Sequence, residues 1–213
     1  MNIRGILTDF DGVVLDSFRE GIRRLQVLAA LHDIPFTRDT RAKLFKFWGM
    51  PGIELLKSAF DIGDTFAKRV YIDWEKLDKS SPPPLVPGAR EALVWVRKNG
   101  MKTGLITSRH RENLMEILDI LDLEREFTVV SAKEDAGPYH KPDPRAFRYA
   151  LETLRDQHGI QESECIFIGD TPSDILAGHN AKLVTLVTQT GPYLLEHTKE
   201  YPIDLANVLK SID

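Results

Sequence analysis

Short apolar runs alternate with longer amphipathic segments along most of the chain. The apolar runs predict strands near residues 3–9, 101–107, 127–130, 165–169 and 184–188. Helical patterns lie between them, and two of these, over residues 87–100 and 143–159, have proline near the start and glycine at the end. This alternation predicts an α/β fold built on a doubly wound parallel sheet.

Residues 17–82 break the alternation, because they hold helical patterns and no convincing strand. The patterns are EGIRRLQVLAAL, GIELLKSAF and FAKRVYIDWEKL, and the proline-rich run SSPPP then ends the segment. We therefore predict a core domain formed by residues 1–16 and 83–213, with a helical cap domain inserted over residues 17–82. The cap has twelve Lys and Arg against nine Asp and Glu, a net charge of +3, and the remainder of the chain has −7.

The first candidate site follows the first predicted strand, in the sequence LTDFDGVVLDS. Asp9 and Asp11 lie two residues apart where the chain leaves the strand, and Gly12 allows the backbone to turn sharply. Taken alone this pattern is weak, because Asp and Gly are also the residues of ordinary polar turns.

Three further segments place polar side chains after predicted strands or in loops. Thr107 and Ser108 follow the second strand, and Lys141 lies in the proline-flanked loop YHKPDP. Asp170 follows the apolar strand CIFIG, with Asp174 four residues later. Each has an ordinary explanation as a helix cap or a solvated residue. Ligands of parallel α/β sheets, however, bind beyond the carboxyl ends of the strands, where we expect these side chains to converge.

The motifs DFDGVV, LITSR, HKPDP and GDTPSD, in this order, resemble the four motifs of the haloacid dehalogenase superfamily. The resemblance spans about residues 3–191, and the helical insertion is similar to the small cap of phosphoglycolate phosphatase and β-phosphoglucomutase. It implies a phosphatase that removes phosphate from a small soluble metabolite through an aspartyl-phosphate intermediate.

The resemblance also implies a catalytic role for the polar residues of the first three motifs. Asp9 would be the nucleophile, and Asp11 would be the general acid and base. Thr107, Ser108 and Lys141 would bind the transferring phosphoryl group. These roles agree with the chemistry of the side chains, because a carboxylate is already ionised at neutral pH and a lysine neutralises phosphoryl oxygens.

Mg²⁺ is the cofactor that the resemblance implies. The side chains of Asp9 and Asp170 and the backbone carbonyl of Asp11 would hold it, with Asp174 supporting the metal site. Carboxylates 4 Å apart repel each other by about 1–4 kcal/mol, and a divalent cation offsets this cost. Oxygen ligands of this kind suit Mg²⁺.

Substrate choice is expected to depend on the cap segment KFWGMPG. Gly49, Pro51 and Gly52 interrupt the helical patterns there and predict a loop between two cap helices. Lys46, Trp48 and Gly49 are the candidate substrate contacts, and the positive cap would favour an anionic substrate. The alternative is an ordinary turn with Trp48 buried in the cap core.

Two other activities stay open. One is a phosphosugar mutase similar to β-phosphoglucomutase, and the other is a non-enzymatic phospho-acceptor switch similar to a response-regulator receiver. The helical insertion and the acid Asp11, which would shorten the life of a stored phosphate, argue against the receiver. Val13 stands where phosphatases of the family commonly have threonine, and Arg109 stands where they often have lysine or a small polar residue, so the identity of the substrate stays open.

Composition narrows the set of partners. The net charge is −4 and no run of Lys or Arg forms a basic stripe, which argues against nucleic acid. No stretch approaches the ~20 apolar residues that a membrane span needs. The single Cys165 is expected to be a quiet core thiol, and the first residues do not resemble a signal peptide, so we expect a cytoplasmic monomer or homodimer.

Overall fold

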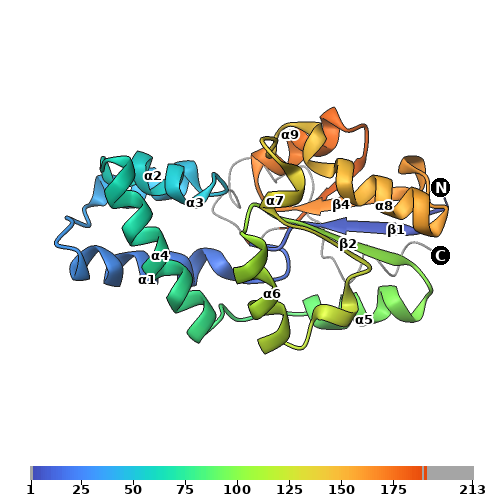
Figure 1. Ribbon diagram of the computed structural model, residues 1–213, viewed down its shortest axis with the longest axis horizontal. Coiled ribbons are helices and arrows are strands. Elements are labelled where there is room, and N and C mark those ends of the chain that lie inside the picture. Colours follow the sequence, from blue (N-terminus) through green and yellow to red (C-terminus); the bar gives the residue numbers. More distant parts are fainter. Residues whose placement is uncertain (1, 189, 191–213) are drawn as a thin grey trace.

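The computed structural model describes residues 2–188 and 190, which form two parts of different construction (Figure 1). One part is built on a sheet of five strands, β1 (Gly5–Thr8), β2 (Lys102–Ile106), β3 (Val129–Ser131), β4 (Cys165–Gly169) and β5 (Val184–Val187). The other part consists of helices α1 (Ser17–Leu31), α2 (Arg38–Phe47), α3 (Gly52–Phe60) and α4 (Asp64–Ser80). The α/β fold with an inserted helical cap, predicted from the sequence, is confirmed.

The order of the strands determines where a ligand can bind. All neighbouring strands are parallel, and they lie in the order β3-β2-β1-β4-β5. The chain therefore extends the sheet on one side of β1, then crosses over and adds β4 and β5 on the other side. Ligands of such sheets bind where the order reverses, outside the carboxyl ends of the strands. In this fold that point lies between the ends of β1 and β4, which face the helical cap (Figure 1).

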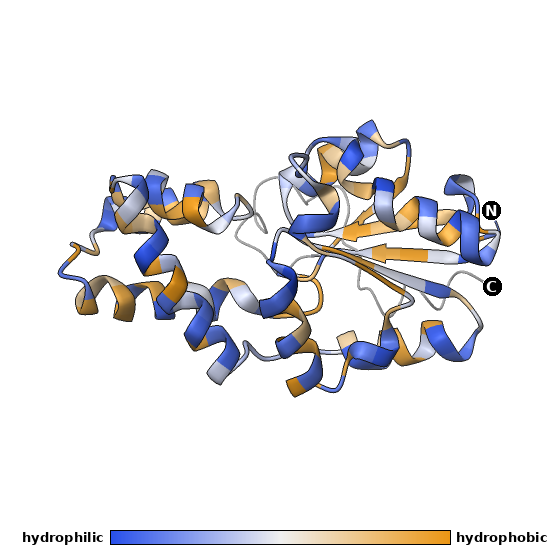
Figure 2. Ribbon diagram, in the orientation of Figure 1, coloured by the Kyte–Doolittle hydropathy of each residue, from blue (hydrophilic) through white to orange (hydrophobic). Residues whose placement is uncertain are grey.

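Helices cover both faces of the sheet (Figure 1). One face is covered by α5 (Ala89–Lys98) and α6 (Arg111–Ile120), and the other by α8 (Arg148–His158) and α9 (Pro172–Asn180). The strands are apolar along most of their length (Figure 2). Leu7 and Phe167 pack with α8 and α9, and Ile6 and Ile166 pack with α5, so side chains alternate between the two faces. The short elements are α7 (Lys133–Ala136) and the 3₁₀ turns Glu124–Glu126, Pro144–Phe147 and Glu162–Glu164.

The cap has a hydrophobic core of its own. Its buried members all come from residues 18–70, and they include Leu25, Leu44 and Leu56, which are fully buried. The indole of Trp48 also packs here, edge-on against Phe18 with the ring centroids 5.1 Å apart. A separate core of this kind allows the cap to keep its shape independently of the sheet.

The two chain segments that enter and leave the cap lie side by side. Asp16 N donates to Pro84 O over 2.8 Å, and Val86 N donates to Val14 O over 2.9 Å. Leu15 and Leu85 form an antiparallel bridge between them. The cap is therefore connected to the core by a short two-stranded ladder.

The structure differs from the predicted elements in several places. The third strand runs over Val129–Ser131, two residues later than expected at its start. The helix expected over residues 143–159 begins as a 3₁₀ turn, capped by Asp143, and ends at the left-handed Gly159. Helix α2 was not among the predicted patterns, because its only buried apolar side chain is Leu44 and no apolar period shows.

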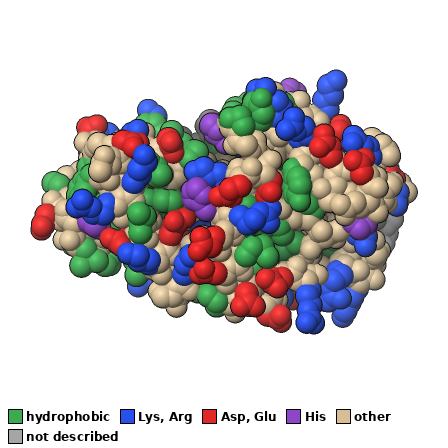
Figure 3. Space-filling view, in the orientation of Figure 1, with side chains coloured by type: hydrophobic (Ala, Val, Ile, Leu, Met, Phe, Trp, Pro, Cys, Tyr) green, Lys and Arg blue, Asp and Glu red, His purple; other side chains and the backbone are tan. Residues whose placement is uncertain are grey.

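Two findings concern possible partners. No helix among residues 2–188 combines the length and the apolar character that a membrane span requires. Acidic and basic side chains are intermixed over the face shown in Figure 3. The exact bounds of the two domains and the expected monomer or homodimer stay predictions.

Gly21 on α1 tests the packing of the cap core. A Cβ atom at this position would lie 2.3 Å from Cη2 of Trp48, so we expect Gly21→Ala to lower the free energy of unfolding by about 1–3 kcal/mol. Thermal and urea unfolding of the purified variant measure this loss. Gly63→Ala is the matched control, because no atom lies within 4 Å of its added Cβ. An equal stability of the two variants would contradict the packing of Trp48 against α1.

Candidate active site

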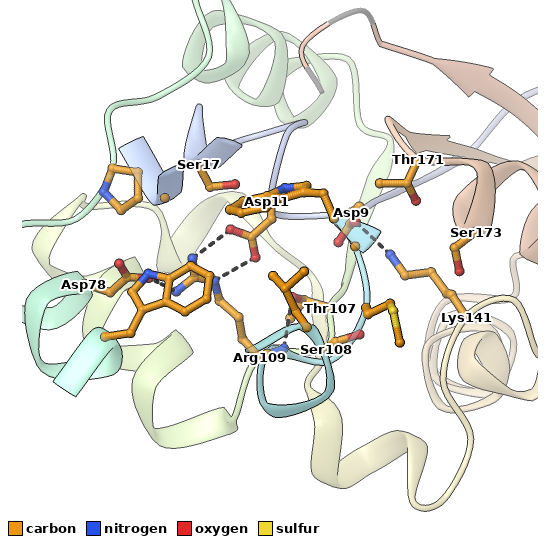
Figure 4. Close-up of a pocket in the computed structure, with 18 of the residues that line it drawn as sticks. Asp9, Asp11, Ser17, Asp78, Thr107, Ser108, Arg109, Lys141, Thr171 and Ser173 are labelled. Carbon is orange, nitrogen blue, oxygen red and sulfur yellow. Dashed lines mark hydrogen bonds and ion pairs between the residues drawn. The ribbon is translucent and has the colours of Figure 1, made fainter. Parts of the chain in front are cut away.

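Polar side chains gather at the carboxyl ends of the central strands (Figure 4). Asp9 directly follows β1, Thr107 follows β2 and Asp170 follows β4. All three are buried, with exposed fractions of 8%, 6% and 3%. Because each of these residues follows a strand, all three lie in the crevice where the strand order reverses, as the sequence predicted.

Asp9 is fixed by both of its carboxylate oxygens. Oδ1 accepts a hydrogen bond of 2.7 Å from Phe10 N, and Oδ2 lies 2.8 Å from Lys141 Nζ. Burial raises the pKa of Asp9 to about 7, although the charge of Lys141 offsets part of this increase. Without a further positive charge, the ionised form that a nucleophile needs is therefore costly in this place.

Lys141 joins the loop after α7 to α9. Its Nζ lies 2.6 Å from Asp174 Oδ1, while Asp174 Oδ2 accepts hydrogen bonds from the Thr171 amide and hydroxyl. Thr171 is the N-cap of α9 and forms a capping box with Asp174. Asp174 is therefore both a helix-capping residue and the partner that orients Lys141. Burial alone would lower the pKa of Lys141, but the charges of Asp174 and Asp9 raise it, so the lysine stays charged.

A cation fits between the carboxylates. One oxygen each of Asp9, Asp170 and Asp174 can be chosen so that all three atoms lie within 4.8 Å of one another. Both carboxylate oxygens of Asp170 are buried without a hydrogen-bond partner among the described residues. A buried carboxylate with no partner is strongly unfavourable, and burial raises its pKa well above the ordinary value. Hard oxygen ligands in this arrangement suit Mg²⁺.

Gly12 leaves the space that Asp170 occupies. Its φ of +79° is in the left-handed region, and an added Cβ would lie 1.9 Å from Oδ2 of Asp170. The glycine predicted to allow a sharp turn therefore has a second role, since only a residue without a side chain admits the carboxylate here.

Asp11 is held by a residue whose role the sequence did not show. Arg109 forms a two-pronged pair with Asp11, from Nε to Oδ2 and from Nη2 to Oδ1, both over 2.7 Å. Its Nη1 also donates to Asp78 of α4 over 2.6 Å (Figure 4). Burial alone would raise the pKa of Asp11, but the charge and the hydrogen bonds of Arg109 lower it below the ordinary value.

A cavity of about 110 Å³ lies between the cap and the core site, and residues of both parts line it. A cavity of about 150 Å³ accommodates a molecule of the size of benzene, so this space suits a small ligand. Thr107, Ser108 and Lys141 line it from the core, and Trp48 and Gly49 line it from the cap. The loop that was predicted at residues 49–52, and that connects α2 to α3, therefore faces the site.

Lys46 is not among the described residues that line this cavity. It lies on the exposed side of α2, with its ammonium 5.2 Å from the centre of the Phe47 ring. Trp48 combines both roles that were considered for it, since it is buried in the cap core and also forms part of the cavity wall.

The cavity wall also includes residues that the sequence reasoning missed. Tyr71, Trp74, Glu75 and Asp78 all line it from α4. Their spacing of i, i+3, i+4 and i+7 places them on one face of the helix. The sequence shows this spacing. A helix face of aromatic and acidic residues does not by itself indicate a binding site, however, so the pattern becomes informative only when the neighbouring site is known.

The comparisons with known proteins agree with this geometry. A model of the haloacid dehalogenase-like hydrolase family matches residues 6–188. A phosphorylated carbohydrates phosphatase of Thermotoga maritima is 28% identical over 228 residues, which cover 99% of this chain and all of that protein.

Two solved structures share the fold over nearly the whole chain. One, from Haemophilus somnus, is described as a predicted phosphoglycolate phosphatase (TM-score 0.83, 19% identity, 100% and 99% of the two chains). The other, from Thermotoga maritima, is provisionally described as a β-phosphoglucomutase (TM-score 0.75, 25% identity, 99% and 100%). Since the family model covers most of the sequence and its motifs meet in one crevice, the chain belongs to the haloacid dehalogenase-like hydrolases.

Proposed function

We propose that this protein is a Mg²⁺-dependent phosphatase that hydrolyses a phosphate monoester of a small metabolite. The observation that carries the proposal is the buried pair of Asp9 and Lys141 beside Asp170, whose carboxylate lacks a partner among the described residues. A nucleophile, a cation for the phosphoryl oxygens and carboxylates suited to a divalent ion are the components that phosphoryl transfer requires.

In the first step, a carboxylate oxygen of Asp9 forms a bond with phosphorus while the bond to the leaving oxygen breaks. Asp11 gives its proton to that oxygen, so the leaving group departs as an alcohol. Lys141 and the Thr107 hydroxyl bind the phosphoryl oxygens. The intermediate is an aspartyl phosphate on Asp9.

In the second step, water attacks the phosphorus atom of the aspartyl phosphate. Asp11, now ionised, takes a proton from this water, and inorganic phosphate and free Asp9 are the products. The pair with Arg109 favours the ionised form that this step needs. The acid role in the first step needs the proton that the same pair disfavours, so Asp11 must take up a proton before the leaving group departs.

Mg²⁺ would be held by the side chains of Asp9 and Asp170 and the backbone carbonyl of Asp11, with Asp174 supporting the site. When bound, it would supply positive charge to the phosphoryl oxygens and offset the repulsion among the carboxylates. Asp174 keeps Lys141 in place through the contact of 2.6 Å.

The relatives support a small phosphorylated substrate. The Thermotoga maritima relative is named for phosphorylated carbohydrates, and the Haemophilus somnus neighbour for phosphoglycolate. The provisional β-phosphoglucomutase keeps a phosphosugar mutase as the second candidate. Release of inorganic phosphate distinguishes the two, because a mutase returns the phosphoryl group to the sugar. The receiver alternative does not fit a chain of this hydrolase family.

We predict that Asp9→Asn lowers kcat for p-nitrophenyl phosphate with Mg²⁺ by more than about a hundredfold, because the amide is no nucleophile and a poor metal ligand. Phosphate release and the unfolding curve are measured together. Asp156→Asn, an exposed change on α8, is the matched control and should keep full activity. Activity of Asp9→Asn above a hundredth of wild type would rule out Asp9 as the nucleophile.

Metal binding should also change the pH dependence of stability. In the metal-free protein, the raised pKa of Asp9 and Asp170 means that the folded state holds protons which the unfolded chain releases, so stability falls as pH rises from about 4 to about 7. Mg²⁺ favours the ionised carboxylates, so it should raise Tm more at pH 8 than at pH 5. At a hundred times its Kd, the gain at pH 8 should be roughly 5–10 °C.

Asp170→Asn should remove most of this gain and should stabilise the metal-free protein at pH 8, because one buried carboxylate is gone. Thermal unfolding with EDTA or MgCl₂ at the two pH values measures both effects, with Asp156→Asn again as the control. A Mg²⁺ gain in Asp170→Asn equal to that of wild type would remove Asp170 from the metal site.

A further inference from the structure

Helix α4 presents a mixed aromatic and acidic face to the cavity. We call Tyr71, Trp74, Glu75 and Asp78 the α4 face, and all four line the cavity. Burial, with the nearby charge of Glu75, raises the pKa of Tyr71. Tyr71 therefore stays protonated, and the α4 face offers the leaving group carboxylate acceptors beside aromatic rings.

The two cations that line the cavity are already paired. Among the described lining residues these are Lys141 and Arg109. Lys141 contacts Asp9 and Asp174, and Arg109 contacts Asp11 and Asp78. The same lining contains five carboxylates, which leaves it with an excess of negative charge.

None of the Lys and Arg residues of the cap belongs to this described lining. The net charge of +3 that the sequence assigns to the cap lies on other surfaces of it, so it does not make the cavity wall positive. The expectation that the cap favours an anionic substrate therefore does not extend to the wall that the leaving group contacts.

We propose that the α4 face selects an uncharged, hydroxyl-bearing leaving group, such as a polyol or a sugar, and rejects one with a second anionic group. Hydroxyl groups can donate to the carboxylates of Glu75 and Asp78, and the C–H faces of a polyol can pack against Trp74 and Trp48. A carboxylate or second phosphate in the same place would face Glu75 without a free cation, and like charges in contact cost several-fold to many-fold in affinity. This inference rests on the proposed phosphatase activity.

A pair of substrates that differ in one group tests the selection. 2-Hydroxyethyl phosphate and 2-phosphoglycolate have nearly the same size, but the first ends in a hydroxyl group and the second in a carboxylate. We expect kcat/KM of the wild-type protein with Mg²⁺ to favour 2-hydroxyethyl phosphate by at least about tenfold. Glucose 6-phosphate and 6-phosphogluconate provide a second pair of the same kind with a larger leaving group.

Glu75→Gln assigns the selection to the α4 face. The amide keeps the shape of the side chain and removes its charge, so the preference for 2-hydroxyethyl phosphate should narrow by about three- to tenfold, chiefly through a higher kcat/KM for 2-phosphoglycolate. Glu112→Gln is the matched control, because this glutamate of α6 has a side chain 86% exposed and lies outside the cavity lining. It should leave the ratio unchanged.

Each outcome decides a different question. A wild-type preference for 2-phosphoglycolate, or an unchanged ratio in Glu75→Gln, would overturn the inference while phosphatase activity stands. In the first case the leaving group would belong in the neighbouring cavity of about 290 Å³, where Lys133 and His140 are among the lining residues. Failure to release phosphate from p-nitrophenyl phosphate and from all four substrates would overturn the proposed function and the inference with it.

Discussion

Charge compensation around Lys141 is the constraint on which the rest of the site depends. The fold brings Asp9, Asp170 and Asp174 into one buried crevice, where a single ammonium group contacts two of them. Such a cluster is stable only with further positive charge or with protons on the carboxylates. The open crevice at the reversal of strand order, the left-handed Gly12 and the capped start of α9 all serve to place these charges.

The connection between cap and core is electrostatic as well as covalent. Arg109 pairs with Asp11 of the core and with Asp78 of the cap, and Arg24 of α1 reaches the other oxygen of Asp78 over 2.6 Å. A chain of buried charges thus links Asp11, the proposed general acid and base, to two cap helices. Losing one member would leave another charge buried without a partner, which costs far more than an exposed pair contributes. The position of the cap and the state of Asp11 are therefore physically coupled.

The core and the cap have different roles in the proposed reaction, and these roles follow from this arrangement. In the proposed reaction the core supplies the groups that act on phosphorus, which lie just after strands or, for Lys141, in the loop after α7. The cap lines the cavity with the loop between α2 and α3 and with one face of α4, where the proposed leaving group would lie. A change of substrate can therefore arise in the cap without any change in the phosphoryl-transfer residues.

The sequence by itself determined the fold class and the candidate residues of the core site. Asp9, Thr107 and Asp170 each follow an apolar strand, and the carboxyl ends of parallel strands meet at one edge of the sheet. It did not reveal helix α2, because this segment is rich in charged residues and its only buried apolar side chain is Leu44, so it shows no apolar periodicity. Nor could it show that Arg109 holds Asp11, since that pair joins residues 98 positions apart. It also assigned charge to the cap as a whole, whereas only the tertiary structure decides which side chains line the cavity. Local sequence patterns determine whether a segment forms a helix or a strand. Packing between distant segments determines which charged side chains come into contact.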